Sequence, residues 1–244
     1  MSALFAGCGS LPVPTRAGTE QAHIWLCEAV RPLQARDTCR LLALLDHGER
    51  QRIYRLQAHG RGDLELLSLG LRRLVLSRYL DCMPSKWTFG RTTYGRPVIT
   101  NGDETTRALR FSVTHTPGLV AIMVFQGMDG GIDAEYMPPL TRPFLGSASS
   151  PHRFYAEWTL KEAVTKGMGL GMALPFRQLK FQKVDQALRL QIVETKRQLA
   201  GWSFHQQFLP SAHSLAIALA TAQARLGWYR ISFQAARAHT WPKA

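Results

Sequence analysis

Two segments with helical periodicity, each flanked by strand-like segments, restrict the fold more than any other feature of the sequence. The first spans residues 64–80, with Arg72, Arg73 and Arg78 off its apolar side. Its apolar stripe consists of Leu67, Leu71, Leu74, Val75 and Leu76. The second spans residues 154–168 and ends among glycines. Each half of the chain therefore combines a long helix with neighbouring strands, which permits two related α/β lobes.

The remaining pattern predicts further strands and a division of the chain into three parts. Alternating or continuous apolar runs predict strands over 23–30, 110–114, 119–125, 130–135, 176–184, 188–193, 201–208 and 214–220. Another helix is expected over 37–57, capped by Asp37 or Thr38 and open to interruption at Gly48. With a boundary near 127–130, we expect a loose arm over 1–20, an N-terminal α/β lobe over 21–127 and a C-terminal α/β lobe over 128–244.

The charge balance points to an acidic partner. The chain has 30 Lys and Arg against 17 Asp and Glu, a formal net charge of +13, which suits a nucleic acid, an anionic membrane, a polyphosphate ligand or an acidic protein. No apolar run reaches the ~18 residues of a membrane span, and none of the 4 cysteines forms a Cys-x-x-Cys pair that would favour zinc. We expect a soluble, cytoplasmic protein with reduced thiols.

Two short motifs carry acidic side chains with the spacing of a site. Asp133 and Glu135 share one face of a strand, where two carboxylates repel unless a cation or hydrogen bonds compensate. The alternative is a polar strand end. Glu162 and Lys166 share one face of a helix, either as part of a site or as an exposed ion pair.

Two further motifs present basic groups after turns or strands. His115 follows an apolar strand between two threonines and either holds a phosphate or is a surface histidine with ordinary hydrogen bonds. The run Tyr94-Gly95-Arg96-Pro97 is a tight turn that presents a guanidinium, or a turn and nothing more. Each signal is weak alone, and the order of the motifs is what makes them specific.

In that order, the motifs resemble those of the phosphopantetheinyl transferases of the surfactin-synthetase-activating (Sfp) type. The matching stretches are Tyr94–Pro97, Phe111–Thr116, Gly131–Glu135 and Trp158–Lys166, within a resemblance over roughly residues 40–220. It implies an α/β (α+β) fold of two similar lobes, a pseudo-dimer, with coenzyme A in the cleft between them. It also implies transfer of 4′-phosphopantetheine from coenzyme A to a carrier-protein serine, with release of 3′,5′-ADP.

The resemblance assigns roles to residues of this chain. Asp133, Glu135 and Glu162 would be ligands of Mg²⁺, an ion that prefers oxygen. Glu162 would also accept the serine proton, directly or through water, and Lys166 would neutralise or protonate the leaving phosphate. The residues expected to contact coenzyme A are Arg52, Arg96, Thr114, His115 and Lys161.

The chain departs from the family pattern in two places. Leu64 and Glu65 stand where the family often has a basic and a small hydroxyl residue, which leaves some contacts to the 3′-phosphate open. The segment between Asp133 and Glu162 is shorter than usual for the family, and its first part, 136–150, is rich in Pro, Ser and Gly. That region borders the surface where relatives dock their carrier proteins.

The expected enzyme is a 4′-phosphopantetheinyl transferase of the holo-[acyl-carrier-protein] synthase type. Its expected partners are coenzyme A and an acidic acyl or peptidyl carrier protein, whose charge complements the basic chain. We expect a monomer that binds neither nucleic acid, for which no recognition signature is present, nor membrane. The alternative is a non-catalytic relative that binds coenzyme A or a carrier protein.

Overall fold

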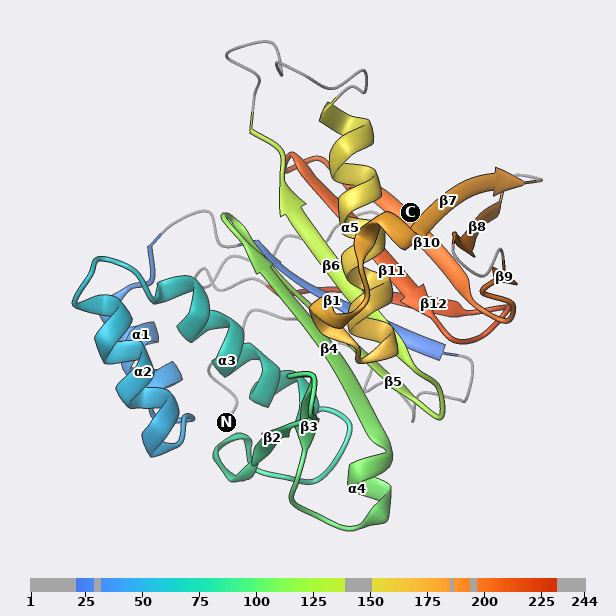
Figure 1. Ribbon diagram of the computed structural model, residues 1–244. Coiled ribbons are helices and arrows are strands. Elements are labelled where there is room, and N and C mark those ends of the chain that lie inside the picture. The colour runs from blue at the N-terminus through green and yellow to red at the C-terminus, as the bar shows by residue number, and fades with distance from the viewer. Residues whose placement is uncertain (1–20, 29–31, 139–150, 185–186, 194–196, 232–244) are drawn as a thin grey trace.

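The computed structural model describes residues 21–28, 32–138, 151–184, 187–193 and 197–231. The fold is mixed α+β, as expected, with two main sheets and a helical layer outside each (Figure 1). The arm expected over 1–20 lies outside the described residues. Among those residues, no helix is both long and apolar enough to cross a membrane, and Cys39 and Cys82 are free thiols.

The first sheet has the strand order β12-β1-β5-β4. Its strands are β1 (Gln21–Glu28), β4 (Leu109–Thr116), β5 (Leu119–Gln126) and β12 (Arg225–Ile231). β1 pairs antiparallel with β5 and parallel with β12. The sequence pattern did not predict β12, which comes from the C-terminal part of the chain and completes the sheet built by the N-terminal part.

The second sheet has the order β10-β11-β6 and packs against the first. Its strands are β6 (Gly130–Tyr136), β10 (Ser203–Leu209) and β11 (His213–Leu219). Alternation along the strands builds the core: Leu119, Ala121, Met123 and Phe125 of β5 face the second sheet, whereas Val120, Ile122 and Val124 face the helices. Strands buried on both faces explain why the sequence shows continuous apolar runs here.

Helices cover the outer faces of both sheets. α3 (Asp63–Leu76) packs on β4 and β5, with α1 (Ala35–Leu42) and α2 (His47–Gln57) against α3. α5 (Pro151–Met168) packs on β6 and β11 of the second sheet. The smaller elements are η2 (Pro84–Lys86), β2 (Phe89–Arg91), β3 (Pro97–Ile99), α4 (Glu104–Ala108), η3 (Gly171–Ala173), η4 (Phe176–Gln178), β7 (Leu179–Val184), β8 (Ala187–Ile192) and β9 (Arg197–Gln198).

The helix expected over 37–57 is two helices. α1 has Gln34 as its N-cap, rather than Asp37 or Thr38. The break lies at Asp46, whose side chain accepts a 2.8 Å hydrogen bond from the backbone of Glu49, while the Glu49 carboxylate accepts one from the backbone of Asp46. This reciprocal capping box starts α2 before Gly48, so the glycine lies inside the first turn and does not interrupt it.

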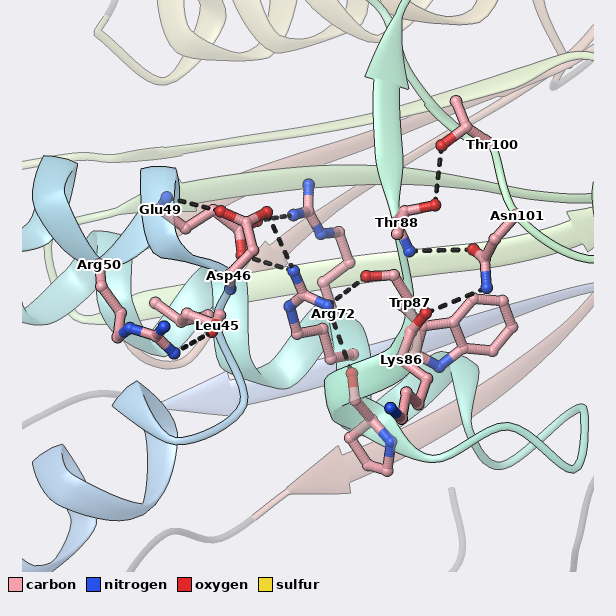
Figure 2. A network of polar contacts seen from close by, with 12 residues as sticks. Leu45, Asp46, Glu49, Arg50, Arg72, Lys86, Trp87, Thr88, Thr100 and Asn101 are labelled. Carbon is pink, nitrogen blue, oxygen red and sulfur yellow. Dashed lines mark hydrogen bonds and ion pairs between the residues drawn. The ribbon is translucent and has the colours of Figure 1, made fainter.

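α3 buries two arginines that lie off its leucine stripe. The Arg73 side chain is fully buried, and that of Arg72 is 11% exposed. Both guanidinium groups donate hydrogen bonds to the carboxylate of Glu49 on α2, at 2.8 Å for Arg72 (Figure 2) and 2.5 Å for Arg73. Arg73 also donates to the carbonyl oxygens of Pro84 and Trp87. Because a charged group can be buried when it is paired, the side of α3 that carries these arginines is buried as well as its leucine stripe.

The two sheets meet along β4 and β6, an edge strand of each sheet. Side-chain hydroxyls of β4 take the place of a backbone ladder by accepting hydrogen bonds from backbone N–H groups of β6. The pairs are Ser112 with Ile132 at 3.1 Å, Thr114 with Ala134 at 3.3 Å and Thr116 with Tyr136 at 3.0 Å. Three hydroxyls at alternate positions thus satisfy an edge that is buried between the sheets.

Candidate active site

Two glycines let α5 approach β6 more closely than any side chain would allow. A Cβ atom on Gly131 would overlap the carbonyl oxygen of Ala163 and the backbone nitrogen of Gly167. A Cβ on Gly167 would press on Trp202 and on the backbone of β6. This contact brings the C-terminal half of α5, with Glu162 and Lys166, against the strand that carries Asp133.

Asp133 and Lys166 form the centre of the site. Asp133 is 4% exposed, and its Oδ1 accepts hydrogen bonds from Lys166 Nζ at 2.7 Å and from Thr114 Oγ1 at 3.0 Å. Lys166 Nζ lies 3.3 Å from the carbonyl oxygen of Ile132. The other carboxylate oxygen, Asp133 Oδ2, is buried and has no hydrogen-bond partner within the described residues. Burial of a carboxylate oxygen without a hydrogen-bond partner costs free energy of folding, and a bound ligand would remove that cost. This oxygen is therefore available to a ligand.

Glu135 and Glu162 lie close enough to Asp133 to share its electrostatic field. Burial, and then the charge of Asp133, raise the pKa of Glu135, while Lys166 opposes the shift. Burial and Asp133 likewise raise the pKa of Glu162, with a further rise from Glu135 and an opposing effect of Lys166. One ammonium group therefore leaves the three carboxylates incompletely neutralised, an arrangement that a cation would relieve.

A pocket of about 390 Å³ opens beside this cluster, between α3 and α5. Its basic side chains are Arg52, Arg72, Arg91, Arg96, His115 and Lys166, and its acidic ones are Glu65 and Glu162. Phe111 and Phe176 add apolar surface. A concave site with this excess of guanidinium groups suits a phosphorylated ligand that also has an apolar or aromatic part.

The turn of residues 94–97 places Arg96 in the pocket wall. Gly95 has a φ of 86°, the left-handed conformation that the turn requires. The Arg96 guanidinium donates to Asp129 at 3.0 Å and to the carbonyl oxygen of Gly167 at 3.1 Å. The guanidinium thus ties the turn to the end of α5, next to Lys166.

The predicted ligand-contacting residues divide into two groups. Arg52, Arg96 and His115 line the pocket, whereas Thr114 and Lys161 are not among its lining side chains. Thr114 is buried and bonds to Asp133 and to the backbone of β6. Lys161 forms an ion pair with Glu157, with 2.6 Å between Nζ and Oε1.

The predicted metal ligands come together without forming a finished metal site. The charge of Asp133 raises the pKa of both Glu135 and Glu162, yet within the described residues no three His, Cys, Asp or Glu side chains are gathered as a metal-binding group. Asp133 Oδ1 instead bonds to Lys166. The donor set still fits a hard cation, because it consists of carboxylate oxygens and includes the unpartnered Asp133 Oδ2.

Sequence reasoning missed two basic residues of the pocket, Arg72 and Arg91. Arg72 is held by Glu49 and lies with its Cζ 3.7 Å from the ring centroid of Phe89. The Asp46–Glu49 capping box was a readable signal for the start of α2, but the contact of Glu49 with α3 depends on how the helices pack. For Arg91, nothing in the local pattern indicated a position in the pocket.

Comparison with known proteins shows the family of this chain. Residues 131–220 match the family model of the 4′-phosphopantetheinyl transferase superfamily. A putative 4′-phosphopantetheinyl transferase of Synechocystis sp. is 30% identical over 174 residues, which cover 63% of this chain and 67% of the relative. The chain belongs to the 4′-phosphopantetheinyl transferase superfamily.

Other members of this superfamily are similar over different lengths. The 4′-phosphopantetheinyl transferase HetI of Nostoc sp. is 26% identical over 229 residues, or 86% of this chain and 90% of the relative. The 4′-phosphopantetheinyl transferase pptA of Paxillus involutus is 28% identical over 165 residues, and this match spans only 61% of that protein. The part matched by the superfamily model, residues 131–220, includes nearly all of β6 and the whole of α5, and thus contains the acidic cluster and Lys166.

Proposed function

We propose that the protein transfers 4′-phosphopantetheine from coenzyme A to a serine of an apo acyl or peptidyl carrier protein and releases 3′,5′-ADP. The observation that carries this proposal is the junction of β6 and α5. There Asp133, Glu162 and Lys166 meet at the edge of a basic pocket large enough for a nucleotide. The superfamily membership supports the reaction class, and the basic pocket supports a nucleotide donor such as coenzyme A.

Each side chain of the junction has a use in that reaction. Glu162 lines the pocket and has a raised pKa, so it is a suitable acceptor for the proton of the incoming serine, directly or through water. Lys166 lines the same pocket and provides a positive charge for the phosphate that leaves. Arg52, Arg96 and His115 would contact the phosphates of coenzyme A.

Thr114 and Lys161 enter the proposal in different ways. The hydroxyl of Thr114 orients Asp133 by a 3.0 Å hydrogen bond, and so acts on the ligand through that carboxylate. Lys161 would contact coenzyme A only by leaving its ion pair with Glu157. The nucleotide contacts therefore depend mainly on the arginines and on His115.

We propose a Mg²⁺ dependence on the same grounds. Asp133, Glu135 and Glu162 would hold the ion, and Asp133 Oδ2 is the oxygen without a partner. When bound, Mg²⁺ would neutralise charge on the pyrophosphate and stabilise the charge that develops during transfer. The carboxylates are the part of the site that this chain supplies.

The partner in this proposal is an acidic carrier protein, attracted by a chain with a net charge of +13. The protein would act as a monomer in the cytoplasm. The segment of the predicted docking surface over 139–150 lies outside the described residues.

The test is the mass of the carrier protein. Purified protein with coenzyme A, Mg²⁺ and an apo carrier should raise the carrier's mass by one phosphopantetheine, and Asp133→Ala should abolish the increase. Absence of transfer over a panel of acyl and peptidyl carriers, with coenzyme A still bound, would favour a non-catalytic binding relative.

A further inference from the structure

One acidic side chain lies in the wall of the otherwise basic pocket, opposite α5. Glu65 is in the first turn of α3, and its side chain is 16% exposed. Its Oε1 is 3.0 Å from Arg52 Nη2, and its Oε2 is 3.3 Å from His115 Nε2. One carboxylate therefore contacts two of the side chains, Arg52 and His115, that would bind coenzyme A in the proposed function.

These contacts reduce the attraction of this wall for an anion. The carboxylate balances the charge of Arg52, whose side chain is 53% exposed and hydrated. Burial lowers the pKa of His115, and nearby Lys166 and Arg52 lower it further, while Glu65 opposes them. A phosphate placed against this wall would meet the Glu65 carboxylate at short range, and like charges at close quarters repel strongly.

The shape of coenzyme A decides which phosphate is affected, an argument that rests on the proposed function. Its pyrophosphate must lie at α5, where Glu162 and Lys166 carry the reaction. In a donor held in this way, the ribose would reach across the pocket to the opposite wall, formed by α3, and its 3′-phosphate would meet Glu65, Arg52 and His115. Figure 1 shows α3 and α5 on either side of β4, the strand that carries His115.

We propose that Glu65 is a specificity-determining residue that disfavours the 3′-phosphate, so that 3′-dephospho-coenzyme A serves as a phosphopantetheine donor about as well as coenzyme A. The chemistry of the step is otherwise unchanged. A bond forms between the serine Oγ and the phosphorus that bears pantetheine, and the bond between that phosphorus and the bridging oxygen breaks, so the bridging oxygen leaves with the nucleotide. The leaving group is 5′-AMP in place of 3′,5′-ADP, and the serine proton passes to Glu162 or water.

The test compares the two donors in the wild-type protein and in Glu65→Gln, which removes the charge and keeps an oxygen for Arg52 or His115. The quantity is the ratio of kcat/KM for coenzyme A to that for 3′-dephospho-coenzyme A. We expect a wild-type ratio below about tenfold, and a rise of about tenfold or more in Glu65→Gln. Glu65→Ser should raise it too, and Glu104→Gln, an exposed carboxylate on α4, should not.

A second measurement keeps the inference separate from the proposed activity. Titration calorimetry with 3′,5′-ADP and with 5′-AMP as probes gives the same selectivity without any transfer. If no donor supports transfer, the proposed function fails while this ratio still decides the role of Glu65. A wild-type preference above about tenfold for the 3′-phosphorylated probe, or a ratio that Glu65→Gln leaves unchanged, would overturn the inference.

Discussion

The buried ion pair between α2 and α3 gives the most quantitative prediction. Glu49→Gln removes the negative charge that faces both Arg72 (Figure 2) and the fully buried Arg73. Arg73 keeps its bonds to two carbonyl oxygens and a 3.6 Å approach to Asp46, a residue that is exposed to solvent. A guanidinium at 0% exposure is then left largely uncompensated.

The magnitude follows from the burial of the pair. Breaking a buried ion pair by removing one partner costs about 3–5 kcal/mol, and the remaining contacts of Arg73 place this case near about 3 kcal/mol. For a chain of this size, about 2–4 °C of melting temperature corresponds to 1 kcal/mol, so the expected drop in Tm is about 6–12 °C. Burial lowers the pKa of Arg72 to about 10, while the charge of Glu49 opposes that shift. The variant therefore also removes the negative charge that stabilises the protonated form of Arg72.

The assay is thermal unfolding followed by circular dichroism at pH 7. Glu104→Gln is the matched control, because Glu104 is exposed on α4 and the same chemical change there should alter stability by less than about 1 kcal/mol. If Glu49→Gln unfolds within about 2 °C of the control, the charge of Glu49 does not compensate the buried arginines, and our account of α3 is wrong.

Three further predictions concern the junction of β6 and α5. Gly131→Ala should separate β6 from α5 and reduce phosphopantetheine transfer at least about tenfold, because misplacement of reacting groups by an ångström has effects of this size or larger. The measurement is the mass of the carrier protein, and wild-type activity would refute the packing argument. Thr114→Val keeps the shape of the side chain but removes two hydrogen bonds, and should lower the free energy of unfolding by about 1–3 kcal/mol, measured by urea denaturation. An unchanged midpoint of the urea transition would count against a stabilising role of the hydroxyl contacts between β4 and β6. Glu135 and Glu162 have raised pKa values, so their contribution to stability without metal is fully present below the ordinary carboxyl pKa of 4.5 and is lost as pH rises through the raised values. The Tm increase caused by Mg²⁺ should therefore be larger at pH 7.5 than at pH 5, and an equal increase at both would argue against these carboxylates as ligands.

Local patterns were sufficient to find the elements that carry the site. The strands around Thr114 and Asp133 and the helix around Glu162 appear close to their predicted bounds. Periodicity succeeds there because each of these segments has a buried face, and burial selects apolar residues at the period of the element. The pattern missed β12, whose mixed burial gives no clear alternation and whose position depends on pairing with β1 at the other end of the chain.

The roles of individual polar residues depended on the tertiary structure. The family resemblance assigned Thr114 to the coenzyme A contacts, and only the tertiary structure showed that the hydroxyls of Ser112, Thr114 and Thr116 bond to the neighbouring strand β6. A hydroxyl satisfies a phosphate and a backbone N–H equally well, so its sequence context does not distinguish the two. Glu65 likewise stands out in the sequence only as an unusual residue, and its ion pairs depend on where α2 and β4 pack.

The sequence by itself determined the chemistry that the chain carries: carboxylates two residues apart on a strand, an acid and a lysine four apart on a helix, and basic residues in a fixed order. Only the tertiary structure decided which of these groups meet, because the contact of α5 with β6 and of α2 with α3 joins residues far apart in the chain. Spacing fixes the face of an element on which a side chain lies, while charge pairing and burial are set by whatever packs against that face.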